Sequence, residues 1–187
     1  MTTAGDAIRR GLLVLLVGAP GSGKSTWALR HFPREQVVSS DELRAAVCGD
    51  PNDQAATPYA VRLLHTFVAA RLHFGQTTVV DATNGEPEHR ATLLRLAELS
   101  RTPAVAVVFD VPLVECLRRN AQRLSGRRVP ETFLRTTHRR IRDGLPVTGA
   151  EPPTGYVAAV VVGPDGSRLL GQLPDPYLGA SWAAAAR

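Results

Sequence analysis

The sequence predicts an α/β fold in which a mostly parallel five-stranded sheet is covered by helices on both faces. Short apolar runs of strand length alternate with stretches of helical periodicity, a pattern typical of parallel sheets built from right-handed crossovers. The first run, Leu12–Val17, is apolar at every position, as expected for a strand buried on both sides. A glycine-rich stretch follows that run and leads directly into a helical pattern. Together these observations predict a three-layer α/β/α domain.

Each expected element has its own local signals. Proline occurs at the expected first turn of four helices, a position where the missing N–H of proline would have no partner within the helix. Gly75 ends the longest predicted helix. The predicted strands are Leu12–Val17, Gln36–Ser39, Thr77–Asp81, Ala104–Phe109 and Tyr156–Val162, with Ser167–Leu170 following a turn at Gly163–Gly166. The predicted helices run from Lys24 to about Arg30, from an N-cap at Ser40 or Asp41, from Pro58 to about Phe74, from Pro87 to about Leu99, from Pro112 to about Leu124 and from Pro130 to about Arg142.

The composition is that of one soluble globular domain. The chain of 187 residues is 44% apolar and 21% charged, which suffices for one hydrophobic core. We expect a lead-in over residues 1–10, a domain over 11–170 and a tail over 171–187. No apolar run is long enough to cross a membrane and the first ten residues lack a signal-peptide pattern, so a cytoplasmic protein without a membrane partner is expected. Cys48 and Cys116 lack the spacing of a metal or redox pair, which indicates buried or semi-buried free thiols.

The glycine-rich stretch matches G-x-x-x-x-G-K-[S/T] between a predicted strand and a predicted helix, the pattern of a phosphate-binding loop, or P-loop. Its glycines, Gly18, Gly21 and Gly23, are expected to permit positive φ angles and close approach to phosphates. Lys24, the only lysine among 22 basic residues, would reach the β- and γ-phosphates, and Ser25 would offer its hydroxyl to Mg²⁺. The residues expected to bind the nucleotide are Gly18, Ala19, Pro20, Gly21, Ser22, Gly23, Lys24, Ser25 and Thr26. The pattern predicts a P-loop NTPase fold.

Other polar residues follow the ends of predicted strands, at the edge where parallel sheets bind ligands. Asp41 comes just after the second strand, where a carboxylate could accept the proton of a substrate hydroxyl. Arg44, three residues later on the same helix face, could hold an anionic group of the acceptor. A helix cap with a surface partner is the structural alternative for this pair. Asp81 ends the third strand and could hold Mg²⁺, or cap the following turn with Thr83 and Asn84.

The positive charge of the chain is concentrated in one segment. Residues 118–142 contain nine arginines and a single acidic residue, although the net charge of the whole chain is only +5. Such a segment is expected to face phosphates or a nucleic-acid backbone, with a solvated helix face as the alternative. Arg119 and Arg123, four residues apart, suit a mobile lid that closes on the donor phosphates. Arg127 and Arg128 could do the same or contact the acceptor.

Four motifs occur in a fixed order along the chain. They are the P-loop continuing to Trp27, Ser40-Asp-Glu-Leu-Arg44, Val80-Asp-Ala-Thr-Asn84 with Arg90, and Arg119-Asn-x-x-Arg123 with Val129-Pro130. Together they resemble the 5′-kinase module of polynucleotide kinases, notably the bacterial RNA-repair type, over about residues 12–162.

This resemblance implies roles for particular residues. Lys24 and Ser25 would bind ATP with Mg²⁺, and Asp41 would be the general base toward a 5′-hydroxyl of RNA or DNA. Arg44 would hold the 3′-phosphate of the terminal nucleotide, and Arg119 and Arg123 would clamp the donor phosphates.

Two other functions fit the same residues. The acceptor could be a small molecule, such as a sugar, a nucleoside, an antibiotic or an aminoacyl group, and such an acceptor would need fewer arginines outside the lid. A regulatory ATPase that has no acceptor is the third hypothesis.

Overall fold

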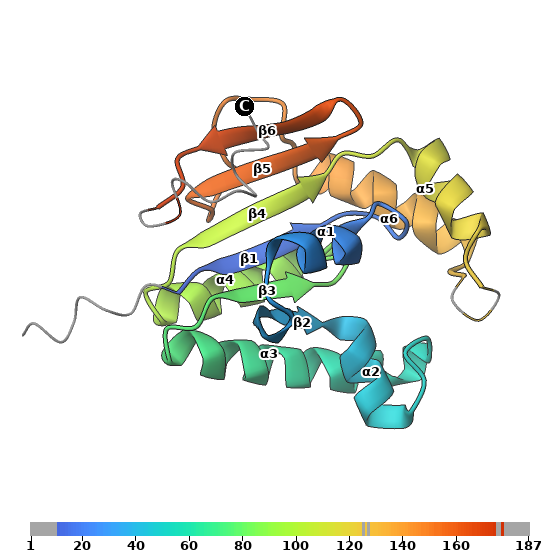
Figure 1. Ribbon diagram of the computed structural model, residues 1–187, viewed down its shortest axis with the longest axis horizontal. Coiled ribbons are helices and arrows are strands. Elements are labelled where there is room, and N and C mark those ends of the chain that lie inside the picture. The colour runs from blue at the N-terminus through green and yellow to red at the C-terminus, as the bar shows by residue number, and fades with distance from the viewer. Residues whose placement is uncertain (1–10, 125, 127, 175–176, 178–187) are drawn as a thin grey trace, which may run out of the picture.

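The structure is a computed structural model that describes residues 11–124, 126, 128–174 and 177. Within these residues the core is one six-stranded sheet with the strand order β2-β3-β1-β4-β5-β6 (Figure 1). Strands β1 to β5 are parallel, as predicted, and β6 is antiparallel to β5. The strands are β1 (Leu13–Val17), β2 (Val37–Ser39), β3 (Thr78–Asp81), β4 (Ala104–Phe109), β5 (Ala158–Gly163) and β6 (Gly166–Gly171).

The prediction of a five-stranded sheet is wrong, because β6 adds a sixth strand at one edge. A tight turn returns the chain along β5, so that Gly163 pairs with Gly166 and Ala158 pairs with Gly171. Within β6 only Leu170 is buried. An edge strand with one partly covered face has few apolar positions, so its sequence carries little of the alternation that identifies a strand.

The described residues form six α-helices whose bounds lie close to the predicted ones. They are α1 (Lys24–His31), α2 (Ser40–Cys48), α3 (Thr57–His73), α4 (Pro87–Leu99), α5 (Leu113–Ala121) and α6 (Glu131–Gly144), with 3₁₀ turns at η1 (Arg34–Gln36) and η2 (Gln54–Ala56). The N-cap of α2 is Ser39, and its side chain makes no capping bond, so the prediction of a cap at Ser40 or Asp41 is wrong.

Helix α5 ends at Ala121, earlier than the predicted Leu124. The side chain of Asn120 explains this early end, because it binds a segment beyond the helix. Its Nδ2 donates to the Val129 carbonyl at 2.9 Å, and its Oδ1 accepts from the Val129 N–H at 3.2 Å. A side chain that bonds to backbone further along the chain competes with continuation of the helix.

Apolar side chains cover both faces of the sheet, which gives the predicted three layers (Figure 1). Successive residues of a strand point to opposite faces. In β1, Val14 and Leu16 accordingly pack with residues of α1 and α5, whereas Leu13, Leu15 and Val17 pack with residues of α3 and α4. All five side chains are fully buried. This central strand therefore holds the start of the P-loop rigidly.

The register of the parallel strands brings several loops to one edge of the sheet. Asp81 at the end of β3 pairs with Leu16 of β1 on one side and with Ser39 of β2 on the other. The P-loop after β1 and the start of α2 after β2 consequently flank Asp81. In Figure 1 the arrowheads of β1, β3 and β4 point toward this edge, where α2 and α5 also lie.

None of the described helices is long and apolar enough to cross a membrane. The predicted lead-in over residues 1–10 and most of the predicted tail over 171–187 lie outside the described residues. Within the described part of the tail, Leu173 is buried in the core and Tyr177 Oη lies 2.7 Å from Thr77 Oγ1. Both cysteines are free thiols, as predicted. Cys116 is buried, but Cys48 is exposed, so the prediction of a buried or semi-buried thiol is wrong for Cys48.

Candidate active site

The P-loop lies between β1 and α1 and packs against α5. Gly21 and Gly23 have φ angles of 85° and 99°, a conformation that favours glycine. A Cβ on Gly21 would also come within 2.7 Å of the Cys116 carbonyl oxygen. Gly18 was expected to need a positive φ and does not have one, but a Cβ there would meet Ser22 Oγ at 2.6 Å. Close approach, and not backbone conformation, is what requires glycine at position 18.

Lys24 begins α1 with its side chain turned back into the loop. Its Nζ donates hydrogen bonds to the carbonyl oxygens of Gly18 at 2.8 Å and Ala19 at 2.9 Å, and the residue is only 8% exposed. Burial lowers the pKa of Lys24 to about 8, and this shift is opposed by Asp81 and reinforced by Arg123. The ammonium can therefore exchange two neutral carbonyl partners for phosphate oxygens, which bind it more strongly.

Ser25 and Asp81, the residues predicted to hold Mg²⁺, are in contact at the end of β3. Burial raises the pKa of Asp81, while a hydrogen bond from the Ser25 side chain and the charge of Lys24 act in the opposite direction. Both residues offer oxygen, the donor atom that Mg²⁺ prefers. Within the described residues, Ser22 Oγ of the P-loop is buried without a hydrogen-bond partner, as expected of a polar atom at a ligand site. These donors fit a triphosphate with its Mg²⁺.

Asp41 and Arg44 form an ion pair on α2. Arg44 Nε also donates to the Pro51 carbonyl at 2.7 Å, so only 13% of the Arg44 side chain is exposed, against 68% for Asp41. The charge of Asp41 raises the pKa values of both Lys24 and Asp81. The structure thus brings Asp41 within electrostatic reach of the P-loop and joins Arg44 to it.

Arg119, in the last turn of α5, lies against the P-loop. Its Nη1 donates to the Gly21 carbonyl at 3.3 Å, and its Nε donates to Glu115 at 2.6 Å. Arg123 follows just after α5 and lies close enough to Lys24 to lower the pKa of that residue. Both arginines expected at the donor phosphates are therefore near the P-loop.

The remaining arginines of the segment 118–142 differ in their partners. Four of them form ion pairs with nearby acidic side chains: Arg118, Arg135, Arg140 and Arg142. Arg128 Nε donates instead to the Arg123 carbonyl at 2.8 Å, and Arg127 lies outside the described residues. Part of the charge that the sequence concentrates here is thus neutralised by acidic side chains on the same or neighbouring helices.

Asn84 and Arg90 support the end of β3, a role that the sequence pattern alone does not assign. Asn84 has a positive φ of 45°, and its Nδ2 donates to the carbonyl of Leu16, two residues before the P-loop, at 2.8 Å. The Arg90 guanidinium is buried and donates to the carbonyls of Asn84, Gly85 and Gly144 at 2.9, 3.0 and 3.0 Å. The sequence does contain one signal for the burial of Arg90. This arginine precedes Leu93 and Ala97 at helical spacing, on the buried face of α4.

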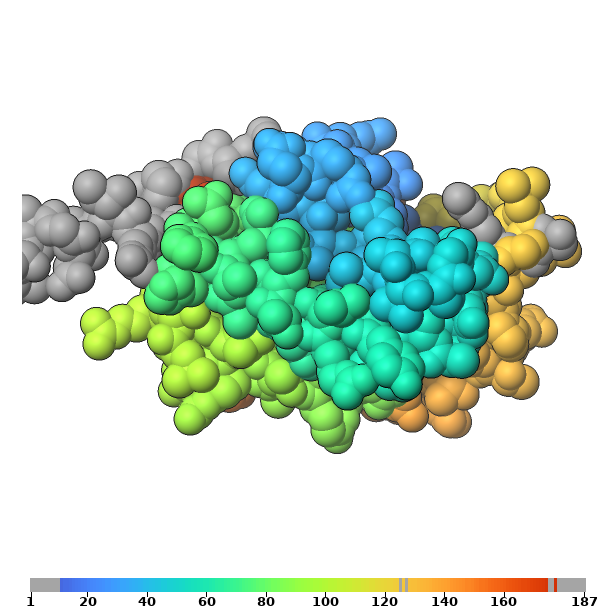
Figure 2. Space-filling view, turned by 90° about the horizontal axis from the view of Figure 1, so that it is seen from below, coloured from blue at the N-terminus to red at the C-terminus, as the bar shows by residue number. Residues whose placement is uncertain are grey.

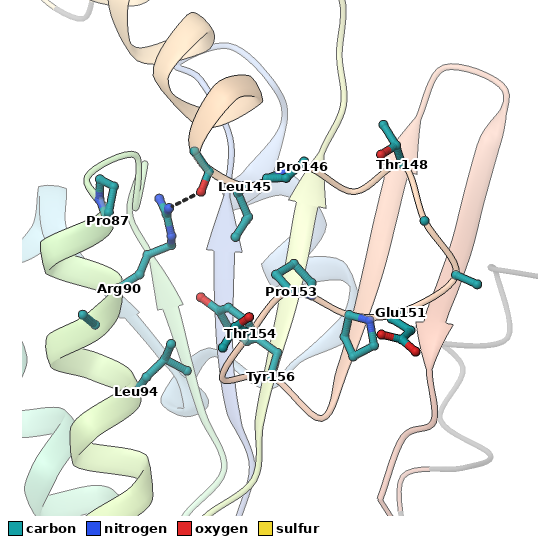
Figure 3. Close-up of a pocket in the computed structure, with 15 residues that line it drawn as sticks. Pro87, Arg90, Leu94, Leu145, Pro146, Thr148, Glu151, Pro153, Thr154 and Tyr156 are labelled. Carbon is teal, nitrogen blue, oxygen red and sulfur yellow. Dashed lines mark hydrogen bonds between the residues drawn. The ribbon is translucent and has the colours of Figure 1, made fainter.

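A cavity of about 740 Å³ lies between α4 and residues 145–156 (Figure 3). The Arg90 side chain extends into this region from α4 and donates to the Gly144 carbonyl across it. The Tyr156 hydroxyl in its wall is buried with no hydrogen-bond partner among the described residues, and burial raises the pKa of Tyr156 to about 12. None of the predicted site residues lines this cavity, so it is separate from the P-loop site.

Solved structures of known proteins share this fold. The chain is 27% identical to Mycobacterium tuberculosis APS kinase CysC, solved with AMPPNP and APS, over 60% of this chain and 70% of that chain, with a TM-score of 0.50. It is 23% identical to a chain of the Pnkp1/Rnl/Hen1 RNA repair complex, over 75% of this chain and 47% of that chain, with a TM-score of 0.63. A second structure of the Pnkp1/Rnl/Hen1 complex gives 27% identity, 62% and 40% coverage and a TM-score of 0.52. The chain therefore spans less than half the length of the two chains from that complex.

A protein-family model described as an AAA domain matches residues 13–147. The matched range begins with β1 and includes the P-loop, α2, the end of β3 and the arginines beside α5. It thus contains each of the candidate site residues described above. Because this model matches well over half of the chain, the chain belongs to this AAA domain family, which is a family of P-loop kinases.

Proposed function

We propose that this protein transfers the γ-phosphoryl group of ATP to the 5′-hydroxyl end of RNA or DNA. The observation that carries the proposal is the Asp41–Arg44 pair at the same sheet edge as the P-loop, with Asp41 in electrostatic reach of Lys24. A carboxylate in this place can act as a general base toward a hydroxyl, and the adjacent guanidinium can hold a phosphate of the same acceptor. The similarity at 27% identity to a chain of the Pnkp1/Rnl/Hen1 complex, an RNA repair complex, supports a polynucleotide acceptor.

The donor half of the proposed site consists of the P-loop and α5. Lys24 would exchange the carbonyls of Gly18 and Ala19 for oxygens of the β- and γ-phosphates. Arg119 and Arg123 would add positive charge from the side of α5. Mg²⁺ held by Ser25 and Asp81 would neutralise charge on the group being transferred.

The acceptor half consists of Asp41 and Arg44. Asp41 would accept the proton of the 5′-hydroxyl while the hydroxyl oxygen bonds to the γ-phosphorus and the bond from phosphorus to the β–γ bridging oxygen breaks. The products are a 5′-phosphate monoester and ADP. Such a transfer depends more on positioning and charge neutralisation than on base strength. Arg44 would give up part of its pairing with Asp41 to bind the acceptor phosphate.

A small molecule is the second candidate acceptor. The similarity to APS kinase favours it, since this chain covers 70% of that protein at 27% identity. The ion pairs of Arg118, Arg135 and Arg140 point the same way, because paired arginines are less available to a polynucleotide backbone. Both candidates use the same donor half and the same base.

Transfer of ³²P from γ-labelled ATP distinguishes the two candidates. The acceptors to compare are 5′-hydroxyl oligonucleotides of several lengths, nucleoside 3′-monophosphates and APS, each with Mg²⁺. We expect oligonucleotides to be labelled, with an acceptor KM that rises steeply with salt because phosphate contacts release counterions. Labelling of APS alone would establish the small-molecule alternative, and labelling of no oligonucleotide of any length would exclude our proposal.

The role of Asp41 is tested by Asp41→Asn, which keeps the size of this exposed side chain. The transfer rate is expected to fall by about 10²- to 10⁴-fold, the usual contribution of a general base, with ATP affinity little changed. Glu42→Gln is the matched control, because Glu42 is the next residue of α2 and pairs with Arg34. If Asp41→Asn retained the rate of the Glu42→Gln control, Asp41 would not be the base.

A further inference from the structure

Glu115, in the first turn of α5, binds two arginines at once. Its Oε1 accepts hydrogen bonds from Arg119 Nε at 2.6 Å and from Arg118 Nη2 at 2.7 Å, and its Oε2 accepts from Arg118 Nε at 2.6 Å. Hydrogen bonds from Arg118 and then Arg119 lower the pKa of Glu115 to about 2. Glu115 is therefore a charged carboxylate with both oxygens engaged at neutral pH.

These bonds fix one edge of the Arg119 guanidinium. With Nε bonded to Glu115, the terminal nitrogen Nη1 of Arg119 lies against the P-loop. Nη1 lies 3.3 Å from the Gly21 carbonyl and would lie 3.7 Å from a Cβ on Gly23. These are the two glycines whose positive φ angles shape the loop.

The backbone of α5 is held against the same loop. The Cys116 carbonyl lies where a Cβ on Gly21 would come within 2.7 Å, and Cys116 itself is fully buried. Arg119 is three residues after Cys116 and therefore shares its face of the helix. Packing at Cys116 thus sets the position of the helix, and Glu115 sets the direction of the Arg119 side chain.

We infer that Glu115 is a positioning residue that directs the terminal nitrogens of Arg119 toward the phosphates of a nucleotide in the P-loop. This inference rests on the donor half of the proposed function and adds a residue that touches neither donor nor acceptor. The Glu115 side chain is 28% exposed and its partner Arg119 is 42% exposed. Among the described residues, the Glu115 carboxylate and the Gly21 carbonyl are the hydrogen-bond acceptors of the Arg119 guanidinium. Arg118, bound to the same carboxylate, in turn holds Glu115.

Two effects of Glu115 on ATP affinity have opposite signs. A negative charge close to a triphosphate repels it, so charge alone predicts tighter ATP binding when Glu115 is neutralised. An arginine released from its partner regains rotamer freedom that it must lose again on binding phosphate, so the positioning role predicts weaker binding. Whether ATP affinity rises or falls when Glu115 is neutralised therefore shows whether charge repulsion or positioning of Arg119 dominates.

The test measures affinity for AMPPNP with Mg²⁺ by isothermal titration calorimetry of the full chain. We expect Glu115→Gln to weaken binding by about tenfold, by analogy with the partners that orient metal ligands, whose removal typically costs about 10- to 100-fold. AMP, which lacks the β- and γ-phosphates, should bind equally well to both proteins. Glu131→Gln is the matched control, because Glu131 forms an i,i+4 pair with Arg135 at 3.1 Å on α6. It should leave both affinities unchanged, and thermal unfolding should show that both variants are folded.

A double-mutant cycle with Arg119→Ala shows whether Glu115 acts through Arg119. If it does, Glu115→Gln causes no further loss of AMPPNP affinity once Arg119→Ala is present. Tighter or unchanged binding in Glu115→Gln, or an equal loss in both backgrounds, would overturn the inference while Arg119 keeps its role. An Arg119→Ala variant with unchanged affinity would remove Arg119 from the donor half and overturn both. The titration contains no acceptor, so a failed acceptor assay does not alter its result.

Discussion

The donor and acceptor halves of the candidate site are built in different ways. The P-loop continues from β1, whose residues are all fully buried, and Lys24 is 8% exposed. None of the nine described residues of α2, which carries Asp41 and Arg44, is buried. Helices α2 and α3 form much of the surface seen in Figure 2. The core therefore fixes the P-loop of the donor half, whereas residues of the acceptor half can change without repacking the core.

The largest effect is expected from a change in the donor half. Lys24→Met should lower transfer to every acceptor by about 10²- to 10³-fold, the loss typical when one group that stabilises transition-state charge is removed. It should not lower the unfolding temperature, since it removes an ammonium whose burial is unfavourable. The measurements are ³²P transfer and thermal unfolding, with Arg95→Met on the exposed face of α4 as the control. Full activity of Lys24→Met would show that the P-loop lysine is not used.

The rigid packing of the donor half is tested by Gly21→Ala. A Cβ here needs a positive φ and meets the Cys116 carbonyl at 2.7 Å, so the free energy of unfolding should fall by about 2–4 kcal/mol. Gly49→Ala, at the end of α2, is the matched control. Its φ of +81° is similar but the space around it is open, so a loss of about 1 kcal/mol is expected. Equal losses in urea unfolding would mean that contact between the P-loop and α5 contributes nothing.

The acceptor half should respond separately from the donor half. Arg44→Ala is expected to raise the acceptor KM by about tenfold, corresponding to one lost charge-assisted hydrogen bond, with ATP affinity unchanged. Arg34→Ala, which removes the partner of Glu42 on the same helix, is the control and should leave both values unchanged. A parallel loss of ATP affinity in Arg44→Ala would show that the two halves are coupled, contrary to the comparison drawn above.

The smallest expected effect is a pH dependence confined to the donor half. The free protein loses the Lys24 proton above a pKa of about 8, so ATP affinity should fall by about fourfold between about pH 7 and 8.5. The unfolded chain keeps this proton up to the ordinary value of 10.5, so folding stability should rise with pH between these two values. Titration calorimetry across this range, with Lys24→Met as the protein that lacks the dependence, checks the assignment. An identical slope in Lys24→Met would assign it to another group.

Local sequence signals predicted most of the elements in the described part of the chain. The bounds of α4 and β4 agree with the prediction at both ends, because a first-turn proline and a continuous apolar run mark them clearly. The cap of α2 and the end of α5 were misplaced. The second of these depends on the contact between Asn120 and Val129, which no local propensity describes.

The sequence by itself determined the parallel α/β architecture, the P-loop and the edge of the sheet at which Asp41 and Asp81 would be found. These follow from periodicity and from motifs that are contiguous in the chain. Only the tertiary structure decided that Arg119 lies against Gly21, 98 residues away, and that Asn84 supports Leu16 across 68 residues. Such contacts depend on the order of strands in the sheet and on which helix covers which face. Packing of the whole chain sets both, because no local stretch can bury its apolar surface alone.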